Sequence, residues 1–259
     1  MILATLAGHG EPMQRLRGIR TPAGTIQGLS QSCGLTLCVV AFTLSAGSTV
    51  MRGAETSNRA TPSYSPQEEP LREYRAFRRM HAWSERFNHE AWMDVLTELK
   101  NGKFEYRVVS ERGSEMIRTR VMHAVLSREQ EMINQGDSEK ADLTPDNYDF
   151  TAAGRDADGS QFVQIKPRRK DSLLVDGRMV LTPDGRDLLR VEGRLAKNPS
   201  FWTSLVNIVR RYARLGGVRV PVSTESTAKV KFAGTAQLQI SYDYETINGQ
   251  PVNLSAQRQ

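Results

Sequence analysis

The hydrophobic and polar positions follow two different periods along the chain. Between residues 71 and 100 the apolar positions recur at mostly helical spacing, and Asn101-Gly102 ends the run. This pattern predicts one long amphipathic helix over 71–100, or two helices joined near Asn88. Its aromatic stripe suits either a plug inside a sheet or an ordinary core-facing helix, and these two interpretations are compatible. The stripe consists of Tyr74, Phe77, His81, Phe87, Ala91, Val95 and Leu99.

After Gly102 the period becomes two, which is typical of half-buried strands. Phe104, Tyr106 and Val108 alternate with polar residues, and a second strand is predicted within "SEMIRTRVMHAVL" at 114–126. Ser127 followed by Gln130 resembles a capping box and predicts a short helix over 128–135. The segment "FWTSLVNIVRRYARLGG" fits both helix and strand spacing, and its β-rich neighbours favour a strand. Further strands are predicted at 162–166, 217–223, 226–233 and 237–244.

Asp-Gly and Asn-Gly pairs punctuate the second half of the chain, at 158–159, 176–177, 184–185 and 248–249. They predict tight hairpins, because glycine accepts a positive φ. An antiparallel meander of about eight or more strands curls, because strands twist and open sheets rarely stay flat. We therefore predict an α+β fold, a half-open curved antiparallel β-sheet (an unclosed barrel) covered by the long N-terminal helix and the short helix.

The first residues have the pattern of a secretory signal. The stretch "MQRLRGIR" at 13–20 is basic, "GLTLCVVAFTL" at 34–44 is apolar, and small residues follow at 45–48. The apolar run breaks well before the about 20 residues that a membrane-spanning helix needs. We therefore predict a signal peptide over 1–48, cleaved near Ser48, with translation starting at Met1 or Met13. Residues 49–70 then form a flexible linker, 71–250 the folded domain and 251–259 a C-terminal tail, and the predicted location is the periplasm.

Predicted export changes what the composition implies. Cys33 and Cys38 both lie inside the signal, so the mature chain has no cysteine for a disulfide, a nucleophile or a zinc site. Removal of residues 1–48 takes away three arginines and one glutamate, which lowers the net charge from +6 to +4. The remaining charge forms no long basic block, so we expect no nucleic-acid partner, and we expect no cofactor and no metal.

No catalytic motif is complete. "HEAWM" at 89–93 has Met93 where a zinc-protease helix needs its second histidine, and "DADGS" at 156–160 misplaces the glycine of a calcium loop. Ser114, in "RGSEM", lacks the second glycine of a nucleophile elbow. We therefore expect no enzyme. A hydrolase with a dispersed site is a weaker alternative, and it requires Ser114, His123 and a carboxylate within hydrogen-bonding reach of one another.

Two groups of residues are candidates for binding. "KPRRK" at 166–170 is either solvated surface or a contact for acidic lipid head groups or a partner, through Lys166, Arg168, Arg169 and Lys170. A curved sheet with few covering helices leaves an apolar concavity, where small hydrophobic ligands bind. The candidate cavity residues are Phe104, Tyr106, Val108, Phe162, Leu189, Val191, Trp202, Leu238, Ile240 and Tyr242.

The run "LLVDGRMVLTPDGRDLLRVEGRLAKNPSFW" at 173–202, followed by "RRYARLGGVRVPVSTESTAKVKFAGTAQLQISYDYETING" at 210–249, resembles exported proteins of the outer-membrane lipoprotein-sorting type, the LolA/RseB-like group. The resemblance covers about 104–250 and rests on the order of its short motifs. It implies an unclosed barrel whose helices form a lid over a hydrophobic cavity, and it implies no chemistry. It also implies an arginine that contacts the lid, for which Arg107 and Arg118 are candidates.

The sequence thus predicts a non-catalytic cell-envelope protein that binds lipid or an acylated lipoprotein in the concavity of its sheet, with peripheral membrane contact. The alternative is a periplasmic sensor or scaffold that binds another envelope protein and fills its interior with its own side chains. A large apolar cavity favours the first hypothesis, and a packed interior favours the second.

Overall fold

The computed structural model describes residues 69–86, 88–199, 203–231 and 234–253. The predicted signal peptide, the linker up to residue 68, Trp202 and the last six residues of the predicted tail lie outside the described residues.

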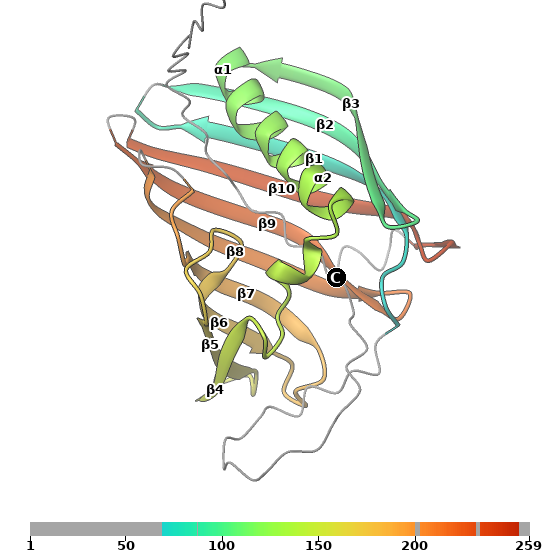
Figure 1. Ribbon diagram of the computed structural model, residues 1–259, viewed down its shortest axis with the longest axis vertical. Coiled ribbons are helices and arrows are strands. Elements are labelled where there is room, and N and C mark those ends of the chain that lie inside the picture. Colours follow the sequence, from blue (N-terminus) through green and yellow to red (C-terminus); the bar gives the residue numbers. More distant parts are fainter. Residues whose placement is uncertain (1–68, 87, 200–202, 232–233, 254–259) are drawn as a thin grey trace, which may run out of the picture. The chain divides into compact units, whose positions relative to one another are not determined.

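A single antiparallel sheet organises the described chain (Figure 1). Its strands run in the order β3-β2-β1-β10-β9-β8-β7-β6-β5-β4, and the short β11 pairs with β10. Strands β3 and β4 are its two edges, so the sheet does not close, and the prediction of an open antiparallel sheet is confirmed. The strands are β1 (Tyr74–Ser84), β2 (His89–Lys100), β3 (Lys103–Gly113), β4 (Tyr148–Arg155), β5 (Gln161–Pro167), β6 (Val175–Leu181), β7 (Leu188–Leu195), β8 (Thr203–Leu215), β9 (Val218–Val230), β10 (Gly234–Ile247) and β11 (Gln250–Pro251).

The prediction of a long helix over 71–100 is wrong, because this segment forms the hairpin of β1 and β2. Alternate residues of β1 are buried, including Ala76, Arg78 and Met80, so the true period is two. The period was hidden because the other face of β1 carries Phe77 and Trp83, and because a buried position is occupied by an arginine.

Helical cover comes instead from one continuous segment, α1 (Glu115–Ile117), the π-helical turn η1 (Arg118–His123) and α2 (Ala124–Asn134), which we call the cover helix. It packs over β1, β2 and β3 on one face of the sheet, which we call the covered face (Figure 1). The strand predicted within 114–126 is therefore wrong, and the short helix predicted over 128–135 is part of a longer one. A short turn, η2 (Ser138–Ala141), follows the cover helix before β4.

The cover helix is amphipathic at a helical period. Its buried residues are Ile117, Met122, Val125, Leu126, Glu129, Met132 and Ile133. From Met122 onward the buried positions 122, 125–126, 129 and 132–133 follow one another at steps of three or four residues and form one stripe. Ser127 and Gln130 form no capping box, because the helix begins well before them; the side chain of Gln130 donates to the Phe104 carbonyl oxygen at 3.2 Å. Within the described residues, no helix is both long and apolar enough to cross a membrane.

The hairpin predictions hold at three of the four pairs. Residues 158–159, 184–185 and 248–249 form turns, and Asn248 itself has φ 48°. Asp176-Gly177, by contrast, lies inside β6, where Gly177 is the partner of Gly193 on β7. A Cβ on Gly177 would lie 2.1 Å from the Glu192 carbonyl oxygen, so glycine is needed there for close strand approach and not for a turn.

The strands from β5 onward agree with the predicted pattern with one merger, whereas β4 was not predicted. The segment 203–215, which fitted both helix and strand, is the strand β8. The two strands predicted at 217–223 and 226–233 form one strand, β9, which pairs with β8 and β10 along most of its length.

Candidate functional site

Most of the apolar candidate residues lie on the covered face. Phe104, Leu238, Ile240 and Tyr242 are buried there, and Tyr106 and Val108 are partly buried beside them. Val191 lies on the same face further along the sheet, where it pairs with Met179. Two candidates lie apart from this group: Leu189 is exposed, and Phe162 packs under the guanidinium of Arg178 at 4.7 Å from its ring centroid. Their part in ligand binding stays a prediction.

An ion pair lies between the cover helix and the sheet. Arg78 Nη1 donates to Glu129 Oε2 at 2.6 Å, and Arg78 Nη2 donates to Glu129 Oε1 at 3.0 Å. Both side chains are nearly inaccessible, with 3% and 4% of their surface exposed. Two parallel bonds between a guanidinium and a carboxylate give a strong and geometrically specific contact. The pair therefore fixes the position of the cover helix over β1.

Aromatic side chains surround this ion pair. The guanidinium of Arg78 lies 4.8 Å from the ring centroid of Tyr242 and 5.2 Å from that of Phe104, and its Nη2 donates to the Tyr74 hydroxyl at 2.7 Å. Burial by itself lowers the pKa of Arg78, but the Glu129 carboxylate together with Tyr74 and Tyr242 outweighs it, and that pKa lies well above its ordinary value. Burial also raises the pKa of Tyr74. The group is thus a charged pair in an aromatic enclosure.

The two arginines considered as lid contacts lie elsewhere. Arg107 is exposed on β3, and Arg118 belongs to the cover helix, where it contacts Glu111. Sequence reasoning missed Arg78 and Glu129 because it assigned β1 to a helix. One signal was present: Glu129 occupies a position of the apolar stripe, between Leu126 and Met132.

Apolar side chains fill much of the covered face. A gap of about 10 Å³ lies between β6, β7 and β8, lined by Leu143, Val175, Val191, Ile208, Arg210 and Tyr212. This volume is about the smallest that can hold one water molecule. The gap is too small for an acyl chain, and none of the residues that line it belongs to the cover helix.

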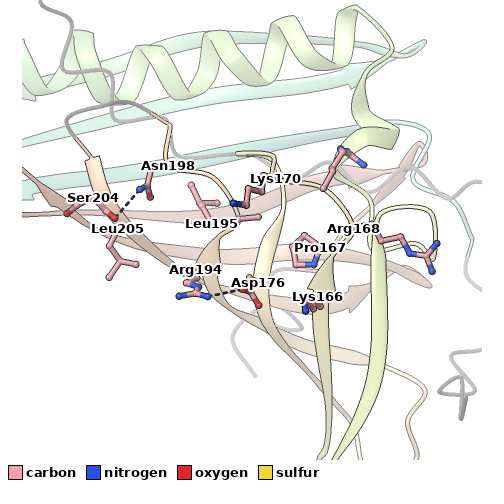
Figure 2. A pocket seen from close by; sticks show the side chains of 12 residues that line it. Lys166, Pro167, Arg168, Lys170, Asp176, Arg194, Leu195, Asn198, Ser204 and Leu205 are labelled. Atoms are coloured by element: carbon pink, nitrogen blue, oxygen red, sulfur yellow. Dashed lines mark hydrogen bonds and ion pairs between the residues drawn. The ribbon is translucent and has the colours of Figure 1, made fainter.

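A larger pocket, of about 430 Å³, lies where four strands end. Because neighbouring strands are antiparallel, the last residues of β5 and β7 and the first residues of β6 and β8 meet at the same end of the sheet. The pocket contains the whole of the predicted basic cluster (Figure 2). Its lining is Lys166, Pro167, Arg168, Arg169, Lys170, Asp176, Arg194, Leu195, Ala196, Asn198, Ser204 and Leu205.

The residues of the dispersed hydrolase site do not come together. His123 Nε2 lies 3.1 Å from Glu111 Oε2, which Arg118 also contacts. Within the described part of the chain, no hydrogen bond joins Ser114 to His123, and no group of histidine, cysteine and acidic residues has the arrangement of a metal site.

No family model matches the chain, and no curated protein matches it in sequence. Two crystal structures are similar to it. One is a DUF1329 family protein from Desulfovibrio piger, with 12% identity and a TM-score of 0.33 over 67% of this chain and 84% of that one. The other is a LolA superfamily protein from Nitrosomonas europaea, with 10% identity and a TM-score of 0.32 over 68% of this chain and 87% of that one. At these identities and TM-scores, neither supports a conclusion about family or function.

Proposed function

We propose that this protein is a non-catalytic binding protein of the cell envelope, located in the periplasm, which takes up a lipid or the acyl chain of a lipoprotein between its cover helix and its sheet. The observation that carries the proposal is the amphipathic cover helix, which lies on an apolar sheet face and is fixed there by the buried Arg78–Glu129 ion pair. A ligand that enters must replace the apolar stripe of the cover.

The energetics of such an exchange favour an amphipathic ligand. Each methylene that leaves water for the covered face contributes about 0.8 kcal/mol, so an acyl chain can replace the contacts of the cover. Separation of the cover also removes Glu129 from Arg78, and a buried guanidinium without an anion is costly. A ligand whose chain ends in an acidic or strongly polar group meets both requirements.

The test uses the mature protein purified from the periplasm of its own cells. Native mass spectrometry followed by lipid extraction looks for a stoichiometric lipid, and a fluorescent fatty acid then measures uptake. Glu129→Gln should change the affinity for the fatty acid several-fold, because it weakens the fixation of the cover. The control is Glu131→Gln, which removes an exposed glutamate two residues further along the same helix. A clean mass together with no uptake by the wild type or by Glu129→Gln would contradict the proposal.

The packed interior favours a second candidate function. The apolar residues of the covered face are buried against one another, so the chain suits a sensor or scaffold that binds another envelope protein and never opens. The same measurement separates the two candidates, because a scaffold takes up no fatty acid in either form.

A further inference from the structure

We propose that the pocket at the ends of β5–β8 is a binding site for a phosphate group, carried by an ester such as a phospholipid or present as the free ion. Lys166, Asp176 and Arg194 lie in one row across neighbouring strands, on the sheet face opposite the buried Ile165, Val175 and Leu195. The site therefore lies at the strand ends and mostly on the uncovered face, with Leu195 reaching it from the covered face, and it exists whether or not an acyl chain enters under the cover helix.

The cations of this pocket are not equivalent. Arg169 is committed to the fold, because its guanidinium donates to Asn147 Oδ1 at 2.5 Å, to the Lys140 carbonyl oxygen and to Asp171 Oδ2 at 3.3 Å. Each of the other two arginines has a carboxylate partner. Arg168 pairs with Asp149 at 2.9 Å, and Arg194 pairs with Asp176 at 3.0 Å. Three carboxylates thus match the three arginines.

The two lysines are left over. Lys166 and Lys170 are exposed, and within the described residues neither has a carboxylate oxygen within ion-pair distance. The pocket therefore holds two uncompensated positive charges in a recess. This charge matches a phosphate monoester, which carries about 1.5–2 negative charges at neutral pH. Lysine is a common phosphate ligand, since its ammonium group acts as a compact point charge with three donors.

The remaining lining fits the rest of a phosphate ester. The Asn198 amide donates one hydrogen to the Ser204 carbonyl oxygen at 3.0 Å and keeps a second for a ligand, whereas the Ser204 hydroxyl donates to the Lys229 carbonyl oxygen at 3.1 Å and can only accept. Leu195, Leu205 and Pro167 provide apolar surface beside them (Figure 2). A volume of about 430 Å³ lies within the range of small-molecule sites, about 300–1,000 Å³. A recess of this kind suits a small anion or a head group better than the broad surface of a protein.

The experiment measures phosphate binding by the full protein and by two matched double variants. Lys166→Gln/Lys170→Gln neutralises the two unpaired lysines. Lys100→Gln/Lys103→Gln removes the same charge at the β2–β3 turn, where both lysines are exposed. The probes are inorganic phosphate and dihexanoyl phosphatidic acid by calorimetry, and phosphatidylglycerol against phosphatidylcholine vesicles by co-sedimentation.

We expect the pocket variant to lose affinity at least tenfold and the control variant less than twofold. Binding of the two soluble probes identifies a free anion or a dispersed ester as the source of the phosphate. Binding to phosphatidylglycerol vesicles alone identifies a membrane lipid, and both results support the site. Equal losses in the two double variants, or no binding of any probe, would overturn it.

A single substitution tests the charge argument in the opposite direction. Asp176→Asn removes the one carboxylate that lines the pocket and releases Arg194. Phosphate affinity should therefore rise several-fold, and a fall would contradict the site. None of these substitutions touches the cover helix, so failure here leaves the fatty-acid experiment to decide the proposed function by itself.

Discussion

Removing the charge of Glu129 should be among the most damaging single changes in this protein. In Glu129→Gln the buried guanidinium of Arg78 keeps its position but loses its counter-charge, and the amide oxygen can accept from only one of the two Nη groups. Breaking a buried ion pair from one side costs about 3–5 kcal/mol. Because the amide keeps the shape of the carboxylate, we expect a loss near the lower end, about 3 kcal/mol.

Urea unfolding followed by tryptophan fluorescence measures this loss, because Trp83 lies on the same strand as Arg78 and Trp92 lies on the neighbouring β2. The matched control is again Glu131→Gln. Glu131 pairs with Arg128 at the surface, where both side chains are about half exposed, so its removal should cost less than about 0.5 kcal/mol. A total stability of about 5–15 kcal/mol is typical, so the difference between the two variants is easily resolved.

The double variant Arg78→Met/Glu129→Met and its two single variants, Arg78→Met and Glu129→Met, form a double-mutant cycle. Replacement of both charges by apolar side chains removes the desolvation cost of each, so it should destabilise less than Glu129→Gln alone. The reasoning is refuted if Glu129→Gln costs less than about 1 kcal/mol, or if the double variant costs as much as the two single changes added together.

Three other predictions concern stability. Gly177→Ala should cost about 3 kcal/mol in urea unfolding, because the new Cβ meets the Glu192 carbonyl oxygen. Gly102→Ala should cost about 1 kcal/mol, because its Cβ has open space around it and only the φ of 72° strains the backbone. Equal costs of the two variants would contradict the argument that glycine is needed at 177 for close strand approach. Trp92→Ala should cost about 1–2 kcal/mol, because its indole stacks on His81 at 4.7 Å and lies under the Arg112 guanidinium at 4.3 Å, whereas Glu98→Ala on the same strand should be nearly neutral. Stability should fall as the pH rises above about 10. Burial raises the pKa of four tyrosines, Tyr74, Tyr148, Tyr212 and Tyr244. These phenols therefore keep their protons in the folded chain at a pH at which they ionise in the unfolded chain. Burial lowers the pKa of Arg219 to about 10, which acts in the opposite direction, but it is one group against four. Tyr148→Phe should lose less stability than the wild type between pH 9 and 11, each measured against its own value at pH 7, and identical pH profiles would show that Tyr148 contributes nothing.

The second half of the fold could be predicted because its side chains alternate clearly. On β10, Leu238, Ile240 and Tyr242 are buried and are separated by polar residues, as the pattern indicated. In the first half, the alternation of Phe104, Tyr106 and Val108 predicted β3 correctly, but β1 and β2 could not be predicted in this way. In β1, aromatic residues occupy the outer face, and a buried position holds Arg78, whose burial depends on a glutamate that lies 51 residues further along the chain. A local pattern contains no information about such a partner.

The two candidate sites show the same contrast. The basic cluster at 166–170 was visible as a run of charge, but its division into paired arginines and unpaired lysines depends on Asp149, Asp171 and Asp176, which other segments contribute. The size of the space beneath the cover also depends on packing. Only the structure shows that Phe104 contacts the cover helix, through Gln130 and Asn134. The sequence pattern had assigned the start of that helix to a strand.

The position of β1 in the sheet has a consequence for how the chain folds. Every other neighbouring pair of strands in the sheet is consecutive in sequence, but β1 pairs with β10 from Tyr74↔Ile247 to Ser84↔Ala236. The sheet is therefore two meanders, β1–β3 and β4–β10, joined along one seam. Each meander can form from local contacts, whereas the seam closes a very long loop, so its formation should limit the folding rate. Until the seam closes, β1 and β10 are both open edges, and the β1–β3 meander of one molecule can pair with β10 of another to give an exchanged dimer.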